Sequence, residues 1–209
     1  MNGRLIYVFG FIIALIALGM GWYTGKVSLT QALDKKTLEE VGAFVYDVPR
    51  PVTEFSLVDQ HGQAFNNSRL LGKWSFVFFG YTHCPDVCPG TMLVYQALNA
   101  EFSDRGITDT QMLMVTVDPA RDNVETLQGY LAFFNPEYIG LTGEEAVIRR
   151  FAQSLNAGFS IPEHAEGEPY FVDHSSHIAL VDPDGNFAGF FQMPHKAAVI
   201  ATILNALRH

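Results

Sequence analysis

The sequence predicts an α/β fold, in which helices cover both faces of a mixed β-sheet and a single membrane-spanning helix precedes the domain. Apolar runs of strand length alternate with segments of helical spacing, and the chain closes with a β-hairpin and one last helix. An uncharged apolar stretch near the N-terminus predicts the membrane helix. Of the 209 residues, 48% are hydrophobic and 17% are charged, so the chain can bury one full core.

The apolar stretch covers residues 5–23 and carries no charge between Arg4 and Lys26. It matches the roughly 20 apolar residues that cross a bilayer. A cleaved signal peptide is the alternative, but the run exceeds the usual apolar region of about 7 to 15 residues, and no A-x-A-like site follows it. We therefore expect an uncleaved N-terminal membrane anchor over residues 1–25.

A linker and a small β-hairpin are expected after the anchor. Residues 26–50 are mixed and polar, and prolines at their end favour an extended backbone. The domain itself is expected over residues 51–209. It opens with two short alternating runs between Glu54 and Phe65, on either side of a turn that contains glycine, which is the pattern of a β-hairpin.

Two buried strands and their helices come next. Residues 74–81 and 112–117 are apolar runs of strand length, as expected for strands that are buried on both faces. Helical spacing follows the first strand after Pro89, whose missing N–H costs nothing in a first turn. Helical spacing returns over residues 124–134. This β/α alternation is typical of an α/β domain.

The rest of the chain completes a three-layer sandwich. The expected elements are a short strand at 138–141, a helix at 144–155, an acidic loop at 157–169, strands at 177–181 and 187–192 around an Asp-Pro-Asp-Gly turn, and a helix at about 196–207. This order fits the thioredoxin-like fold, and the N-terminal hairpin suits its peroxiredoxin-like elaborations. We find no internal repeat.

Charge and cysteine content exclude several functions. The chain has 13 basic and 22 acidic residues and a net charge of −9, which repels phosphate backbones and argues against nucleic-acid binding. Its two cysteines, Cys84 and Cys88, cannot form the multi-bridge framework of a small secreted scaffold. A disulfide between them would close too short a loop to stabilise the fold much, so a chemical role is favoured.

The two cysteines lie where a buried strand ends and a helix begins. Free N–H groups and the helix dipole stabilise a thiolate there, so we expect Cys88 in particular to be more acidic than a free thiol. The three-residue gap between Cys84 and Cys88 suits either a reversible disulfide or two thiolate ligands on one ion. Spacing alone does not choose between these uses.

A third ligand is sought among the seven histidines, because a Cys2His site can hold copper in both oxidation states. His83 adjoins Cys84, but neighbouring side chains diverge in an extended backbone. His174 immediately precedes a strand, and the period of two sends His177 to the opposite face. The remaining histidines are expected at the solvated surface: His61, His164, His195 and His209.

Four motifs together resemble the Sco/SenC family of copper chaperones for cytochrome oxidase. They are GYTHCPDVCP at 80–89, DPARD at 118–122, VDHSS at 172–176 and DPDG at 182–185, within a resemblance that runs from about residue 53 to the end. The resemblance implies that Cys84, Cys88 and His174 bind one copper ion, as Cu(I) or Cu(II). Ala120 departs from the family, whose members often have Glu there. Asp118 and Arg121 are expected to be structural or to face a partner.

The resemblance also implies a function and a location. The domain would deliver copper to the binuclear copper centre of cytochrome c oxidase subunit II during assembly. Another copper chaperone or a thiol reductant would be a further partner. The anchor would hold the domain on the periplasmic side of a bacterial inner membrane, although the basic residues beside the apolar stretch do not by themselves settle its orientation.

The alternative function is enzymatic. Cys84 and Cys88 would then form a redox-active dithiol that reduces cysteines of the oxidase subunit or of another exported partner. The thioredoxin-like fold favours this alternative. The CxxxC spacing in place of CxxC, and an imidazole for which a redox couple has no need, favour metal delivery.

Overall fold

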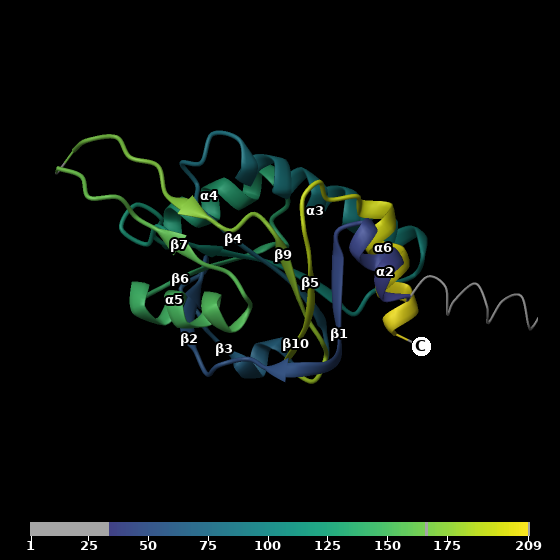
Figure 1. The fold of residues 1–209 in the computed structure, drawn as a ribbon. Coiled ribbons are helices and arrows are strands. Elements are labelled where there is room, and N and C mark those ends of the chain that lie inside the picture. The colour runs from purple at the N-terminus through teal and green to yellow at the C-terminus, as the bar shows by residue number, and fades with distance from the viewer. Residues whose placement is uncertain (1–33, 166, 209) are drawn as a thin grey trace, which may run out of the picture.

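The structure, a computed structural model, describes residues 34–165 and 167–208 (Figure 1). Among these residues, none of the helices combines the length and the apolar character that crossing a membrane requires. The anchor predicted over residues 1–25 lies outside the described residues.

One mixed sheet of eight strands forms the centre of the domain, in the order β1-β10-β9-β4-β5-β6-β2-β3. The central strands β4, β5 and β6 run parallel to one another, and the other neighbours are antiparallel. The strands are β1 (Ala43–Pro51), β2 (Ser56–Asp59), β3 (Ala64–Asn66), β4 (Trp74–Gly80), β5 (Thr110–Thr116), β6 (Ile139–Thr142), β9 (Ile178–Val181) and β10 (Asn186–Phe191). A separate two-stranded sheet pairs β7 (Phe159–Ser160) with β8 (Asp173–His174).

Helices cover both faces of the main sheet (Figure 1). They are α2 (Lys35–Glu40), α3 (Val87–Asp104), α4 (Val124–Phe134), α5 (Glu145–Ser154) and α6 (Ala197–Leu207), with a 3-10 turn at Asn67–Leu70. In Figure 1, α3, α4 and α6 lie on one side of the sheet and α5 lies on the other. The described domain is therefore the mixed three-layer α/β sandwich that the sequence predicts.

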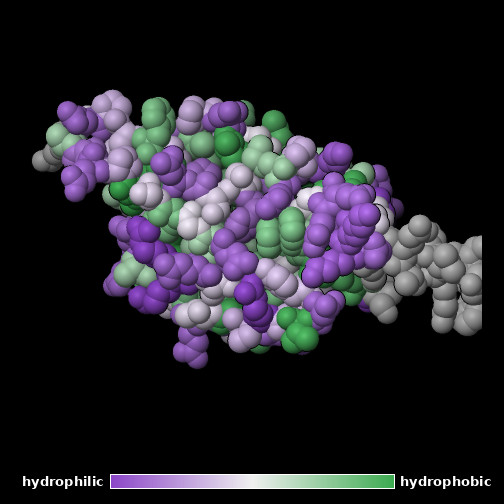
Figure 2. Space-filling model, viewed as in Figure 1, coloured by the Kyte–Doolittle hydropathy of each residue, from purple (hydrophilic) through white to green (hydrophobic). Residues whose placement is uncertain are grey.

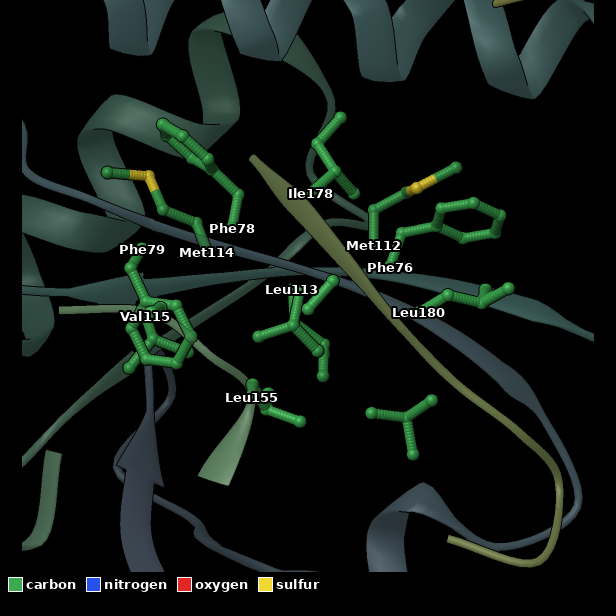
Figure 3. Packing of buried hydrophobic residues seen from close by; sticks show 14 of the residues in the cluster. Phe76, Phe78, Phe79, Met112, Leu113, Met114, Val115, Leu155, Ile178 and Leu180 are labelled. Atoms are coloured by element: carbon green, nitrogen blue, oxygen red, sulfur yellow. The ribbon is translucent and has the colours of Figure 1, made fainter. Parts of the chain in front are cut away.

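Successive side chains of β4 and β5 point to opposite faces of the sheet, so these two strands contribute to the core on both sides of the sheet. Every residue of β4 is buried, as expected for a strand covered on both faces. Figure 3 shows Phe78 and Met114 on the side of the sheet that faces α3, whereas Phe79 and Val115 point to the opposite side. Burying each of these large apolar side chains stabilises the folded state by about 1.5–3 kcal/mol. The buried methionines of β5, Met112 and Met114, are therefore core residues.

Residues 35–50, which were expected to belong to the linker, are part of the folded domain. They form α2 and β1, and β1 pairs antiparallel with β10. The rings of Phe44 and Phe190 stack at 4.8 Å across this pair. The prolines that suggested a linker are tolerated because β1 is an edge strand with an irregularity between Val45 and Arg50, where missing N–H donors cost little.

The two predicted hairpins are present. β2 pairs with β3, and β9 pairs with β10 across the Asp-Pro-Asp-Gly turn. The carboxylate of Asp182 accepts the backbone N–H groups of Asp184 at 3.1 Å and Asn186 at 2.8 Å, so this turn closes on its own side chain. The acidic loop that begins after β7 projects at the upper left of Figure 1, and Figure 2 shows mostly hydrophilic residues on it.

Candidate metal centre

Three segments bring two thiols and one imidazole together. The loop after β4 carries Cys84, the first turn of α3 carries Cys88, and β8 carries His174. Their ligand atoms all lie within 4.8 Å of one another, and the Sγ of Cys88 is 3.6 Å from the Nε2 of His174. The structure therefore gathers the three residues that the sequence singled out, although 86 positions separate Cys88 from His174.

Cys88 is the buried member of the group, with no exposed surface. Its Sγ accepts the backbone N–H of Tyr81 at 3.5 Å. Gly80 makes this position available, because a Cβ there would lie only 2.8 Å from the sulfur and 2.5 Å from the ring of Phe78. The glycine at the end of β4 is thus required for the thiol to sit against the strand.

The pKa of Cys88 is shifted upward, whereas the sequence predicted a downward shift. Burial raises the pKa of this thiol, and the neighbouring Cys84 adds to the increase, whereas the N–H of Tyr81 opposes it. Desolvation outweighs the helix N-terminus because the sulfur lies inside the core. The thiol of Cys88 is therefore protonated at neutral pH in the metal-free protein, and the prediction of an acidic thiol was wrong.

The imidazole of His174 presents the correct nitrogen to the thiols. Its Nδ1 lies 3.1 Å from the carbonyl oxygen of Ser175, which can only accept, so the neutral ring carries its proton on Nδ1. The lone pair of Nε2 then faces Cys88. Burial lowers the pKa of His174, which keeps the ring neutral and able to coordinate. The rings of Phe78 and Tyr81 hold the imidazole edge-on at 5.8 and 5.7 Å.

The other histidines of the described residues do not join this group. The Nε2 of His177 faces the carbonyl oxygen of Leu155 at 3.2 Å, outside the group of Cys84, Cys88 and His174. His195 was expected at the solvated surface, but it is half-buried and its Nε2 lies 3.0 Å from the carbonyl oxygen of Ser176. His61 and His164 are exposed as expected, and His209 lies outside the described residues.

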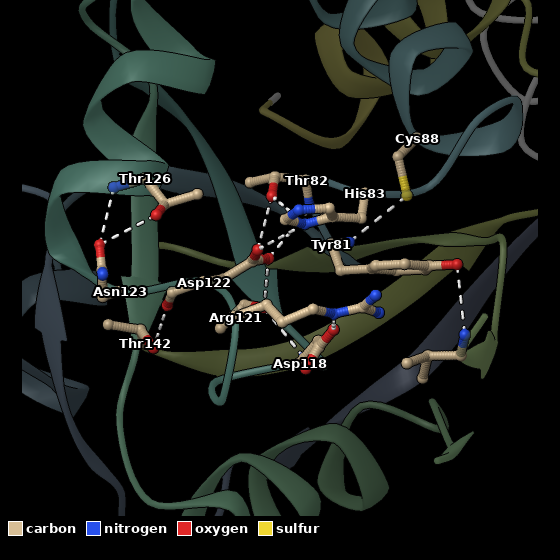
Figure 4. Close-up of polar contacts among 12 residues, drawn as sticks. Tyr81, Thr82, His83, Cys88, Asp118, Arg121, Asp122, Asn123, Thr126 and Thr142 are labelled. Atoms are coloured by element: carbon tan, nitrogen blue, oxygen red, sulfur yellow. Dashed lines mark hydrogen bonds and ion pairs between the residues drawn. The ribbon is translucent and has the colours of Figure 1, made fainter. Parts of the chain in front are cut away.

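The side chain of His83 does not join the group formed by Cys84, Cys88 and His174, but its backbone lies in a turn and not in the extended conformation that the sequence suggested. Its Nδ1 lies 3.0 Å from the Oγ1 of Thr82 and 3.7 Å from the carboxylate of Asp122. Figure 4 shows the ring directed toward these two residues and away from Cys88. His83 therefore packs beside the site and is not part of the Cys2His group.

Asp122 is the residue of this region that sequence reasoning missed. Its buried carboxylate accepts the backbone N–H of Thr82 at 2.9 Å, the hydroxyl of Thr82 at 2.6 Å and the hydroxyl of Thr116 at 2.7 Å (Figure 4). The carboxylate thus fixes the backbone two residues before Cys84. The last position of the DPARD motif was the signal available in the sequence.

Asp118 and Arg121 hold the segment that leads to His174. The guanidinium of Arg121 donates to Asp118 and to the carbonyl oxygen of Tyr170, and it stacks 3.6 Å from the centre of the Tyr170 ring. The hydroxyl of Tyr170 donates to Asp118 at 2.8 Å. Farther along the same segment, the N–H of Val172 donates to the hydroxyl of Tyr81 at 3.2 Å. Of the two roles expected for Asp118 and Arg121, the structural one is observed.

The half-buried histidines predict how the stability of the metal-free protein depends on pH. Burial lowers the pKa values of His174, His177 and His195 from the ordinary 6.5. Below about pH 6.5 the unfolded chain binds protons that the folded chain does not, so the free energy of unfolding should decrease as the pH falls. Urea unfolding at about pH 7.5 and about pH 5.5 measures this decrease.

A smaller decrease is expected for His177→Asn, and an unchanged one for His61→Asn, which removes an exposed histidine. Equal stability at both pH values in the wild-type chain would contradict this prediction.

Comparison with known proteins identifies the family. The family described as SCO1/SenC matches residues 47–209. The chain belongs to the SCO1/SenC family. A relative from Stutzerimonas stutzeri, named for copper binding, is 33% identical over 174 residues, which cover 83% of this chain and 85% of the relative. The human mitochondrial SCO1 homologue is 31% identical over 88% of this chain, and the match spans only 60% of the human protein.

A solved Sco structure supports both the fold and the metal. Yeast Sco1, solved with copper bound, superposes with a TM-score of 0.71 at 31% identity and covers 77% of this chain and 90% of the yeast chain. The fold is therefore the thioredoxin-like Sco fold. Two thiols and an imidazole within 4.8 Å of one another are a soft donor set that suits copper, and this Sco chain binds one copper ion.

Proposed function

We propose that Cys84, Cys88 and His174 ligate this copper ion, and that the chain delivers it to the binuclear copper centre of cytochrome c oxidase subunit II during assembly. The observation that carries the proposal is the convergence of the three ligand atoms within 4.8 Å. A related protein, BsSco, is described as a member of the Sco family of cytochrome c oxidase assembly proteins. The family resemblance supports subunit II as the acceptor.

The burial of the three side chains suggests an order of transfer. Cys88 is fully buried, whereas Cys84 and His174 retain partial exposure. An incoming acceptor thiolate or imidazole can therefore first displace Cys84, while Cys88 holds the ion until last. Copper would leave by stepwise ligand exchange and would never be released as a free ion.

The location of the protein is part of the proposal. An anchor over residues 1–25 would hold the domain on the periplasmic side of the inner membrane. Another copper chaperone would supply the ion, or a thiol reductant would keep Cys84 and Cys88 reduced. The long apolar stretch and the family resemblance support this arrangement.

The second candidate function is thiol–disulfide exchange. Cys84 and Cys88 are both free thiols whose sulfur atoms lie within 4.8 Å of each other, so they can form a disulfide and pass two electrons and two protons to a partner disulfide. The imidazole of His174 has no part in that exchange. The neutral ring of His174 presents its Nε2 to the thiols, which favours copper delivery as the main function.

A comparison of variants separates the two functions. We expect His174→Ala and Cys84→Ser both to lose stoichiometric copper, and only Cys84→Ser to lose disulfide reductase activity. His177→Ala is the matched control, because it removes a half-buried imidazole outside the group and should retain copper. Full copper loading of His174→Ala would overturn the proposed ligand set.

Copper affinity should increase with pH in the neutral range. The thiol of Cys88 is protonated there because burial raises its pKa, so copper must displace a proton. Each displaced proton makes the apparent affinity rise about tenfold per pH unit below the thiol pKa. Titration with a competing copper chelator at about pH 6.5 and about pH 7.5 measures this increase. An affinity independent of pH would count against thiolate ligation.

A further inference from the structure

An apolar groove of about 340 Å³ lies between helices α2 and α6, which are side by side in Figure 1. A large-to-small substitution in a protein core leaves a cavity of about 150 Å³, so the groove has room for about two large apolar side chains. Burying apolar surface stabilises a protein, so the groove favours an apolar occupant. Its walls include Leu38 and Val41 of α2 and Ala198, Val199 and Thr202 of α6.

Helix α6 is apolar on its exposed face as well as on its buried face. Its 11 residues, AAVIATILNAL, include no charged side chain. One face buries Ile200 and Leu204 in the core, whereas Ala198 and Thr202 are exposed. A helix that packs on one side only normally carries charged residues on the opposite face. The exposed face of α6 is therefore suited to a second apolar contact.

The first described residue, Asp34, lies at the edge of this groove, because it begins α2. Asp34 is the N-cap: its carboxylate accepts the backbone N–H of Thr37 at 3.3 Å, and its ψ of 126° is extended. In the hydrophobic staple, the residue before the N-cap packs against the fourth residue of the helix. These two positions are Leu33 and Leu38 here, and Leu38 lines the groove.

The segment that precedes Asp34 has the composition that the groove favours. Residues 27–33, VSLTQAL, carry no charge. Leu29 and Leu33 are four positions apart, so they share one face in a helix and in an extended strand alike. Two leucines on one face match a groove with room for about two large side chains. The covalent link at Asp34 also gives this segment a higher effective concentration at the groove than a separate molecule has.

We propose that residues 29–33 of this chain dock in the groove between α2 and α6, with Leu33 packed on Leu38 and Leu29 directed to α6. Docking covers the exposed surface of Val41 and of the outer face of α6. It also supports α2, whose six residues are too few for a helix that is stable alone. The inference goes beyond the proposed function and does not depend on copper.

Docking would also fix how the domain sits on the proposed anchor. Residues 26–33 span at most about 28 Å between the anchor and α2, but docking leaves only residues 26–28 free, a reach of about 10 Å. Helices α2 and α6 would then face the membrane. β7, whose partner strand β8 carries His174, lies at the opposite end of the domain in Figure 1, so His174 would lie on the side away from the bilayer. This consequence rests on the anchor in the proposed function, whereas the docking itself does not.

Photo-crosslinking in the full chain tests the docking. The photoreactive residue p-benzoylphenylalanine replaces Thr202, an exposed residue of the groove, and the chain is reconstituted in vesicles of phosphatidylcholine and phosphatidylglycerol. Trypsin cuts after Lys26 and Lys35, so it releases the segment as one peptide, residues 27–35. We expect mass spectrometry to find this peptide joined to α6, in a protein that migrates as a monomer.

Substitutions in the segment show whether the leucines direct the contact. Leu29→Asp combined with Leu33→Asp should lower the yield of the adduct about tenfold or more, because an ionised carboxylate is costly to bury in an apolar groove. Ser28→Asp is the matched control, since it adds the same charge to the same segment away from the face that the leucines share, and it should keep the wild-type yield. Equal circular dichroism of these chains verifies that the domain is folded in each.

Several results would overturn the inference. They are a crosslink to lipid, a crosslink between two chains, the absence of an adduct with residues 27–35, and an adduct that persists at wild-type yield after both leucines are replaced. Copper takes no part in any of these measurements. A chain that forms the adduct but does not bind copper would overturn the proposed function and leave the docking intact, so the two failures are distinguishable.

Discussion

A chain carrying Cys88→Ser is expected to lose about 100- to 1000-fold in copper affinity while it keeps its fold. Structural metal sites with four ligands gain about 10–16 kcal/mol, or roughly 2.5–4 kcal/mol for each ligand, and each 1.4 kcal/mol is tenfold in affinity. Serine is close to cysteine in size, but its oxygen is a hard donor that copper(I) does not select. Cys84 and His174 would remain as an incomplete pair.

The measurement is a competition titration of copper(I) against a chelator, together with urea unfolding of the metal-free chain. Met92→Leu is the matched control, because it removes another fully buried sulfur from α3 and conserves volume. The control should bind copper as the wild-type chain does. If Cys88→Ser bound copper within tenfold of the wild-type affinity, the buried thiol would not be a ligand.

Asp122→Ala is expected to have the largest effect on stability, a loss of about 3–4 kcal/mol in the free energy of unfolding. The carboxylate is fully buried and accepts three hydrogen bonds from Thr82 and Thr116. Hydrogen bonds to a charged group contribute about 1.5–3 kcal/mol each, and a buried donor left unpaired costs about 1–3 kcal/mol. The partial exposure of Thr82 lets water recover some of this loss.

Urea unfolding of the metal-free protein tests the effect of Asp122. Copper affinity should fall as well, because the backbone that positions Cys84 is no longer fixed. Thr142→Val is a control in the same network, since it removes one neutral bond from the Thr142 hydroxyl to the backbone oxygen of Asp122 and should cost only about 1 kcal/mol. A loss below 1 kcal/mol for Asp122→Ala would show that the three bonds do not support the fold.

Much of the fold was predictable because its central elements have strong local patterns. The apolar run of β4 and the helical spacing of α4 are visible over short windows, and the structure places both where the sequence does. β1 was not predictable in this way. It is an edge strand that contains prolines, and its strand conformation depends on pairing with β10 at the other end of the chain.

The candidate site likewise has features that the sequence predicts and features that it does not. The spacing of Cys84 and Cys88 and the motif around His174 were sufficient to select the three residues that the structure brings together. The role of Asp122 was not visible, because a carboxylate in a loop motif gives no sign of which backbone it will meet. Its partner Thr82 lies 40 positions earlier in the chain.

The amino-acid sequence by itself determined the family, the order of the central strands and helices, and the identity of the two thiols and one imidazole. Only the tertiary structure decided that Cys88 is buried, that this burial raises the pKa of its thiol, and that His174 presents Nε2 to it. Propensity and motif are properties of neighbouring residues. Burial, tautomer and hydrogen-bond satisfaction depend on side chains that meet only after distant segments have packed.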